Sequence, residues 1–218
     1  MPSTTFENLA PEKRERFVLE ARDEFARCPY DQASITAIVK RLGIAKGSVY
    51  QYFDDKLDLF AWLVGEAGRR KVAGLGSVAP AGGDPYALLR AAYRDGLRYW
   101  LAEPEWSRLA LRVLEPSVDA GVSRLRRSQE AAVHAWLEQW LAEGQRTGAV
   151  RRDLPVADGA RLVRGLLSEG LLSAFLGRLG TDADAFLEAP SDLPAHAVAE
   201  ALGVADVAVD LLERALRP

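Results

Sequence analysis

A short stretch near the N-terminus is rich in side chains that donate hydrogen bonds. The donors are Lys46, Ser48, Tyr50, Gln51 and Tyr52, and Gly47 lies among them. Between residues 32 and 53 there are three basic residues and no acidic one. Hydroxyl, amide and ammonium donors bind DNA phosphates, and residues at the start of an exposed helix reach base edges in the major groove. The stretch therefore predicts a surface that binds nucleic acid.

Two short helices are predicted to position these side chains. Ser34 is placed to cap a helix that runs to about Leu42. Gly43 is the residue type that ends a helix in the left-handed conformation. A second short helix follows over about 45–53, with its apolar residues at helical spacing. Two short helices joined at a glycine predict a helix-turn-helix.

Two longer helices are expected to flank this pair. The first covers about 11–27, with a proline in its first turn and one apolar face. The second follows Asp54, which is expected to cap it, and runs to about residue 72. The apolar faces of all four helices predict one common core.

This stretch resembles the TetR family of bacterial transcriptional regulators over about residues 10–62. The resemblance rests on the spacing of a turn glycine, the second short helix and a following lysine. The matching residues are Ile38, Gly43, Ile44, Lys46, Gly47, Ser48, Tyr50, Tyr52, Phe53, Lys56 and Leu59. Two residues depart from the family pattern, Val39 in place of Ala and Ala45 in place of Ser or Thr. The second exchange removes a helix cap worth ~1 kcal/mol.

The resemblance implies a role for each matching polar residue. The positions implied to lie near the bases are Lys46, Gly47, Ser48 and Gln51. The positions implied to contact the DNA backbone are Thr36, Tyr50, Tyr52 and Lys56. Ordinary packing is the alternative for the two tyrosines, and a solvated helix end is the better interpretation of Lys40 and Arg41.

The rest of the chain is predicted to be helical as well. A break rich in Gly and Pro falls between about 72 and 84, as a joint or as a plain surface loop, and divides the chain into domains 1–72 and 73–218. Helices are expected over about 85–102, 104–116, 118–147, 155–179 and 194–216. The predicted fold is all-α with about nine helices. It has an N-terminal three-helix helix-turn-helix domain for DNA binding and a larger helical domain for ligand binding and dimerisation.

Large aromatic side chains gather between residues 84 and 137. Helices packed around many rings tend to enclose an apolar cavity with a few polar groups, and the resembling family binds its inducer in this module. The candidate ligand-binding residues are Tyr93, Trp100, Trp106, Arg112, His134, Trp136 and Phe175. A plain aromatic core is the alternative. Other arginines nearby, including Arg90 and Arg108, are expected to be solvated.

The last two predicted helices combine small and apolar residues on more than one face. The helix over 155–179 carries Gly and Ser among leucines, and the helix over 194–216 is rich in Ala and Val. Apolar surface on both sides of a helix needs a cover beyond the chain's own core. The resemblance implies a homodimer through these two segments, and internal packing alone is the alternative.

Composition excludes several other classes of protein. A content of 49% hydrophobic and 27% charged residues is ordinary for a globular fold, and a net charge of −3 argues against indiscriminate nucleic-acid binding. One Cys and two His do not make a structural zinc site, and no metal or cofactor is expected. The longest apolar run is far shorter than a membrane span, which needs about 20 residues, so a cytoplasmic protein is expected. No arrangement of nucleophile, base and orienting group supports an enzyme.

The sequence therefore predicts a ligand-responsive transcriptional regulator that binds double-stranded DNA. It is expected to act as a repressor that a small, largely hydrophobic inducer releases from its operator. The alternative is an all-α small-molecule-binding or scaffolding protein that no longer binds DNA. Retention of Lys46, Tyr50 and Lys56 argues against that alternative.

Overall fold

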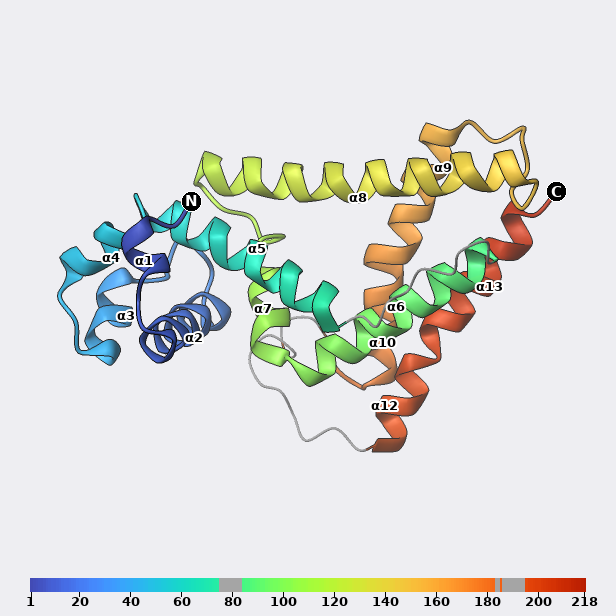
Figure 1. The fold of residues 1–218 in the computed structure, drawn as a ribbon. Coiled ribbons are helices and arrows are strands. Elements are labelled where there is room, and N and C mark those ends of the chain that lie inside the picture. Colours follow the sequence, from blue (N-terminus) through green and yellow to red (C-terminus); the bar gives the residue numbers. More distant parts are fainter. Residues whose placement is uncertain (75–83, 183–184, 186–194) are drawn as a thin grey trace. The chain divides into compact units, whose positions relative to one another are not determined.

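The computed structural model of the chain describes residues 1–74, 84–182, 185 and 195–218. Its regular structure is helical, as the sequence predicts, and no strand occurs among these residues (Figure 1). The helices are α1 (Thr4–Glu7), α2 (Pro11–Arg27), α3 (Ile35–Leu42), α4 (Lys46–Tyr52), α5 (Lys56–Gly74), α6 (Pro85–Ala102), α7 (Pro104–Arg112), α8 (Ala120–Thr147), α9 (Val156–Gly165), the π-helix η1 (Leu166–Gly170), α10 (Leu171–Arg178), α12 (Ala195–Leu202) and α13 (Val204–Leu216). Within the described part of the chain, no helix is both long and apolar enough to cross a membrane.

The chain forms two compact units. Unit 1 consists of Met1–Gly74 and Glu103–Arg127, and unit 2 consists of Leu75–Ala102 and Ser128–Pro218. Helix α8 begins in unit 1 and continues into unit 2.

This division differs from the sequence-based domains 1–72 and 73–218 in one respect. Residues 103–127 group with the N-terminal helices, because α7 packs along α2 and α5. The break expected between about 72 and 84 lies mostly outside the described residues.

The core of unit 1 contains a cluster of aromatic rings. The ring of Phe6 lies 5.0 to 5.7 Å from the rings of Phe17, Tyr52, Phe53 and Trp62. Phe6 is 1% exposed and belongs to α1, a helix that the sequence analysis did not predict. Helix α1 packs against α4 and so closes the cluster next to the helix-turn-helix.

The cap of α5 differs from the prediction by one residue. Asp55 caps the helix, since its Oδ1 accepts a hydrogen bond from the backbone N–H of Asp58 at 2.7 Å. The carboxylate of Asp58 in turn accepts from the backbone N–H of Asp54 at 3.2 Å. The exchange resembles a capping box, in which two side chains satisfy N–H groups at the start of a helix.

Unit 2 is built around α6, α10, α12 and α13, which pack against one another. Arg90 on α6 was expected to be solvated, but its guanidinium joins α6 to α13. It lies 2.8 Å from Asp210 Oδ1 and 3.3 Å from Glu213 Oε2. Trp140 on α8 adds a T-shaped contact with Tyr86 at 5.7 Å between ring centroids.

The two C-terminal predicted helices are each subdivided. The segment predicted over 155–179 is a run of α9, η1 and α10, in which a π-helical turn interrupts the α-helical hydrogen bonding. The segment predicted over 194–216 consists of α12 and α13, which meet at Gly203.

Candidate nucleic-acid interface

The caps of α3 fix the turn that leads into α4. Ser34 Oγ accepts a hydrogen bond from the backbone N–H of Ala37 at 3.3 Å, which confirms the predicted cap. Gly43 has φ of 69°, the left-handed conformation that favours glycine, and the next N–H, that of Ile44, donates to the Val39 carbonyl at 3.1 Å. An added Cβ at Gly43 meets nothing within 4 Å, so backbone conformation rather than space calls for glycine here.

A buried carboxylate holds α3 against α2. Glu24 is 2% exposed, and its Oε1 accepts a hydrogen bond from the backbone N–H of Ser34 at 2.9 Å. Its Oε2 lies 2.5 Å from Arg27 Nη2 and 3.0 Å from Arg41 Nη1. Glu24 was not among the predicted site residues, although it follows Phe17 by seven positions and therefore lies on the apolar stripe of α2.

Arg41 is exposed, as expected of a helix end, but its guanidinium is paired with carboxylates. Its guanidinium lies 2.8 Å from Glu20 Oε2 as well as near Glu24. Burial lowers the pKa of Arg41, but the hydrogen bonds and the negative charges of Glu20 and Glu24 together outweigh burial and raise it. Lys40 is exposed. The positive charge that this face offers to solvent thus comes from Lys40 and Lys46 rather than from Arg41.

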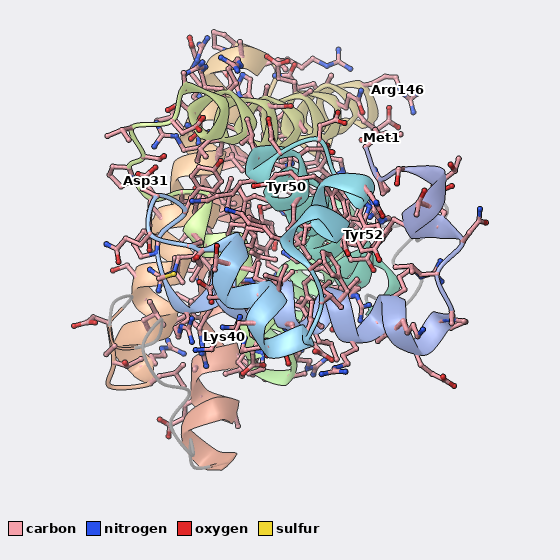
Figure 2. The ribbon with its side chains drawn as sticks, turned by 90° about the vertical axis from the view of Figure 1, so that its left-hand side faces the viewer. Met1, Asp31, Lys40, Tyr50, Tyr52 and Arg146 are labelled. Carbon is pink, nitrogen blue, oxygen red and sulfur yellow. The ribbon has the colours of Figure 1, made fainter. Side chains whose placement is uncertain are left out.

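One face of α4 is apolar and buried, and the other is polar and exposed. Val49 and Phe53 are 1% and 2% exposed. The exposed residues of this region that the sequence singled out are Thr36, Lys46, Gly47, Tyr50 and Gln51, and Ser48 is half-buried. Tyr50 is 49% exposed, and Figure 2 looks onto this end of unit 1 with Lys40, Tyr50 and Tyr52 labelled. Ala45 supplies no side-chain cap, as its residue type predicts.

Two of the predicted backbone-contacting residues are partly engaged in packing. Tyr52 is half-buried, and its ring lies 5.7 Å from that of Phe6 and 5.5 Å from that of Phe17. The Lys56 ammonium lies 4.4 Å from the ring centroid of Tyr30, a cation–π distance. Both residues therefore lie at the edge of the exposed face, where one side of each side chain packs against protein.

The candidate ligand residues divide between the two units. Trp106 and Arg112 belong to unit 1. Trp106 is 1% exposed and has two guanidinium groups over its ring. Arg112 donates to two carbonyl oxygens at the C-terminal end of α2, both at 3.1 Å, and pairs with Glu115 at 2.5 Å. These interactions within unit 1 account for the burial of both side chains. Arg108, expected to be solvated, is only 9% exposed.

The other candidate ligand residues belong to unit 2. They are Tyr93, Trp100, His134, Trp136 and Phe175. Phe175 is fully buried, whereas Trp136 is 40% exposed. His134 Nε2 lies 3.3 Å from Glu138 Oε1, one turn along α8. Burial raises the pKa of Tyr93 to about 12.

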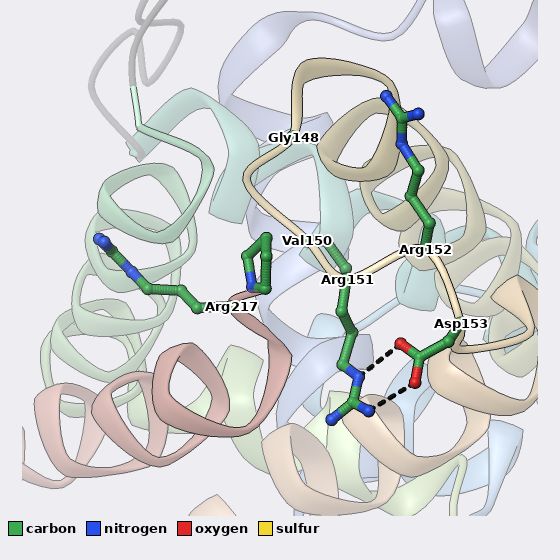
Figure 3. A pocket seen from close by; sticks show the side chains of 7 residues that line it. Gly148, Val150, Arg151, Arg152, Asp153 and Arg217 are labelled. Carbon is green, nitrogen blue, oxygen red and sulfur yellow. Dashed lines mark hydrogen bonds and ion pairs between the residues drawn. The ribbon is translucent and has the colours of Figure 1, made fainter.

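An open cavity of ≈ 570 Å³ lies beside the C-terminal ends of α8 and α13 in unit 2 (Figure 3). Its lining residues are Gly148, Val150, Arg151, Arg152, Asp153, Arg217 and Pro218. Arg151 forms two hydrogen bonds with Asp153 at 2.6 and 2.5 Å, and Arg217 pairs with Glu213. None of the candidate ligand residues lines this cavity, so it does not bear on their predicted role.

Comparison with known proteins places the helix-turn-helix in a family. Residues 18–63 match the sequence profile of the bacterial regulatory proteins of the tetR family. The chain is 36% identical over 58 residues to the HTH-type transcriptional repressor BepR of Brucella suis, an alignment that spans 27% of this chain and 28% of that protein. It is 26% identical over 200 residues to the repressor AcnR of Corynebacterium jeikeium, spanning 90% of this chain and all of that protein.

A solved structure extends the similarity over the whole chain. A TetR family transcriptional regulator from Chloroflexus aurantiacus superposes with a TM-score of 0.72 and 29% sequence identity, covering 100% of this chain and 99% of that one. Regulators of this family bind operator DNA and dimerise, and they are not enzymes. The profile match runs from α2 into α5 and so includes the face described above. The helix-turn-helix segment thus matches the TetR family, and over its whole length the chain is similar to transcriptional regulators of that family.

Proposed function

We propose that the chain acts as a homodimeric repressor whose two α4 helices read the half-sites of one operator. The observation that carries this proposal is the two-sided character of α4. Val49 anchors it in the core, while Lys46, Tyr50 and Gln51 are exposed. In a two-fold dimer of this kind, two such helices enter successive major grooves about 34–36 Å apart.

The polar residues of this face divide into two proposed roles. Lys46, Gly47, Ser48 and Gln51 lie at the start and along the outer side of α4, and we assign them to base edges in the major groove. The second set, assigned to backbone phosphates, is Thr36, Tyr50, Tyr52 and Lys56. A cation–π contact with Tyr30 leaves the charge of Lys56 in place and limits where its ammonium moves.

We assign dimerisation to the helices near the C-terminus, within 155–179 and 194–216. Three large apolar side chains there are exposed, Leu162 by 71%, Leu211 by 55% and Val207 by 49%. They lie on α9 and α13 of unit 2. Apolar side chains grouped on helices in this way favour contact with a second protein surface, and a copy of the same chain supplies one.

We assign the ligand response to a small, largely hydrophobic inducer that weakens operator binding. The repressor role is supported by the names of the relatives AcnR and BepR, both transcriptional repressors. Tyr93, Trp100 and Phe175 remain candidates for inducer contact in unit 2. A ligand releases DNA only by binding the released arrangement of the dimer more tightly than the bound one. Operator DNA as the partner implies a location with the chromosome, in the cytoplasm.

DNA binding can be tested by fluorescence anisotropy with a labelled duplex from upstream of the gene. Replacing Lys46 and Tyr50 together by Ala removes one base contact and one phosphate contact, each worth about 1–3 kcal/mol at most. We expect the Kd to rise at least 30-fold. We also expect the slope of log K against log salt to fall by about 1 for each phosphate interaction that the exchange removes.

The matched control is Arg146→Ala, which removes an exposed arginine that pairs with Glu143 on α8. That variant should bind the duplex with unchanged affinity and salt dependence. Wild-type affinity in the double variant, or an equal loss in the control, would contradict the assignment of this face.

A further inference from the structure

Arg108 on α7 is a buried cation without a hydrogen-bond partner for part of its guanidinium. The residue is 9% exposed, and its Nε and Nη2 atoms have no partner among the described residues. The carboxylate of Glu105 lies 3.9 Å from Nη2, beyond hydrogen-bond distance. Because arginine does not lose its proton in proteins, burial leaves a full charge that needs an anionic partner.

Nε and Nη2 form the edge of a guanidinium that can bind both oxygens of one carboxylate. Two other arginines of this chain use that edge in this way. Nε and Nη2 of Arg146 lie 2.7 and 2.5 Å from the two oxygens of Glu143, and those of Arg151 lie 2.6 and 2.5 Å from the oxygens of Asp153. Two parallel N–H groups match the geometry of a carboxylate, which makes this interaction specific as well as strong.

Nearby arginines of unit 1 already have carboxylate partners. Arg22 pairs with Asp23, Arg70 pairs with Glu66 and Glu15, and Arg112 pairs with Glu115. The preceding residue, Ser107, is 1% exposed, and its Oγ also has no partner among the described residues. Two consecutive polar groups on α7 are thus buried without a hydrogen-bond partner for these atoms among the described residues, whereas the three arginines named above each pair with a carboxylate.

The burial of Arg108 limits what kind of anion reaches it. A nucleic acid or a protein surface contacts exposed side chains, so a group this deeply buried fits a small molecule instead. Trp106, Leu109 and Leu111 on the same helix are all buried, so large apolar side chains accompany Arg108 on α7. A monoanion with an apolar body suits that environment better than inorganic phosphate, whose further charges need more donors.

We propose that Arg108 binds the carboxylate of a small amphiphilic acid through its Nε and Nη2 atoms. The proposal deepens the ligand response proposed above, since it gives the chemical class of the inducer and one residue that recognises it. Ser107 is a second polar group on the same turn of α7.

The test measures the thermal unfolding of the full chain without DNA. The probes are hexanoate, decanoate and benzoate, with the three corresponding amides as uncharged counterparts and inorganic phosphate as a second anion. We expect at least one carboxylate to raise the melting temperature saturably, while its amide and phosphate do not. Equal shifts with acid and amide, a shift with phosphate alone, or no shift with any carboxylate would overturn the proposal.

Variants of Arg108 distinguish recognition from a structural role. Arg108→Gln should raise the melting temperature of the free protein, because it removes a buried charge whose nearby carboxylate, that of Glu105, lies 3.9 Å away without a hydrogen bond. It should also raise the Kd of the active carboxylate at least tenfold. Arg108→Lys keeps the charge but not the paired N–H edge, and should weaken binding by an intermediate factor. Arg146→Gln, an exposed arginine on α8, is the control and should change neither quantity.

A lower melting temperature of Arg108→Gln together with an unchanged carboxylate Kd in Arg108→Lys would assign Arg108 to structure alone. The failure of this proposal and that of the proposed function are separable, because the binding assay contains no DNA. A carboxylate that binds through Arg108 and leaves operator affinity unchanged would support the site and contradict the ligand-responsive part of the function.

Discussion

Unit 1 buries charged side chains, whereas the arginines that join helices of unit 2 stay partly exposed. The buried polar and charged residues of the described chain are Glu24, Ser107, Arg108 and Arg112. All four belong to unit 1. In unit 2 the side chains of Arg90 and Arg94, which pair with acids of α13, are 29% and 40% exposed.

This difference matches what each unit has to do. Hydrogen bonds and ion pairs are directional, so the interactions of Glu24 fix where α3 begins and thereby where α4 presents its polar face. The apolar surfaces that Leu162 and Leu211 offer on α9 and α13 are not directional, and they gain free energy only when a second surface covers them. Geometry is thus specified within unit 1, and in the proposed dimer association is specified on unit 2.

The largest effect is expected from removing the buried carboxylate of unit 1. Glu24→Ala leaves the Ser34 N–H and the Arg41 guanidinium without their buried acceptor. Breaking a buried ion pair from one side costs about 3–5 kcal/mol. We expect a loss of that size in the free energy of unfolding by urea, measured by circular dichroism, and faster hydrogen exchange over residues 34–42.

Two controls separate the charge from the hydrogen bond. Glu24→Gln keeps an acceptor for the Ser34 N–H and should cost about half as much as the alanine exchange. Glu20→Ala removes the partly exposed partner of Arg41 and should cost less than about 1 kcal/mol. A Glu24→Ala variant no less stable than Glu20→Ala would show that buried charge does not hold the helix-turn-helix in place.

The next effect concerns the exposed apolar side chains of unit 2. A double exchange of Leu162 and Leu211 to Glu places charges in the proposed dimer interface. We expect a monomer in analytical ultracentrifugation and an operator affinity about 100-fold lower, since a monomer does not gain from linking two half-sites. Val118→Glu changes a side chain of unit 1 that is 95% exposed and should leave the dimer intact. A dimer that survives the double exchange would move the interface elsewhere.

The sequence predicted helix boundaries well where a local residue type, such as proline or glycine, fixes the start or the end of the helix. Pro11 and Pro104 stand at the first turns of α2 and α7, and Gly43 ends α3 in the left-handed conformation. It did not predict α1, because four residues make a helix only when Phe6 packs on rings that come later in the chain. Nor did it predict the π-helical turn η1, which ordinary helical spacing does not distinguish.

The candidate site was predictable for a similar reason. Inward spacing of Val49 and Phe53 leaves the polar residues of α4 on the opposite side, and Tyr50 is exposed accordingly. Arg112 was predicted to contact a ligand, yet it donates to carbonyls at the end of α2, more than eighty residues earlier in the chain. No local pattern encodes an interaction over that separation. The roles of the individual site residues remain predictions.

The smallest effect concerns the hydroxyl of Tyr93 on α6, a half-buried residue of unit 2. Burial raises its pKa to about 12 in the folded chain, against about 10 when unfolded. The folded state therefore keeps a proton that the unfolded state releases, so this stability is complete below about pH 10 and is lost as pH rises towards about 12. Thermal unfolding should be measured at about pH 9 and about pH 11. Between these pH values the free energy of unfolding should fall by about 1 kcal/mol less in Tyr93→Phe than in the wild type. The same exchange at Tyr50, which is 49% exposed on unit 1, is the matched control for loss of a phenol hydroxyl and should leave the free energy of unfolding at about pH 9 unchanged. Equal pH dependence in wild type and Tyr93→Phe would place the alkaline sensitivity outside α6 and remove this contrast between the units.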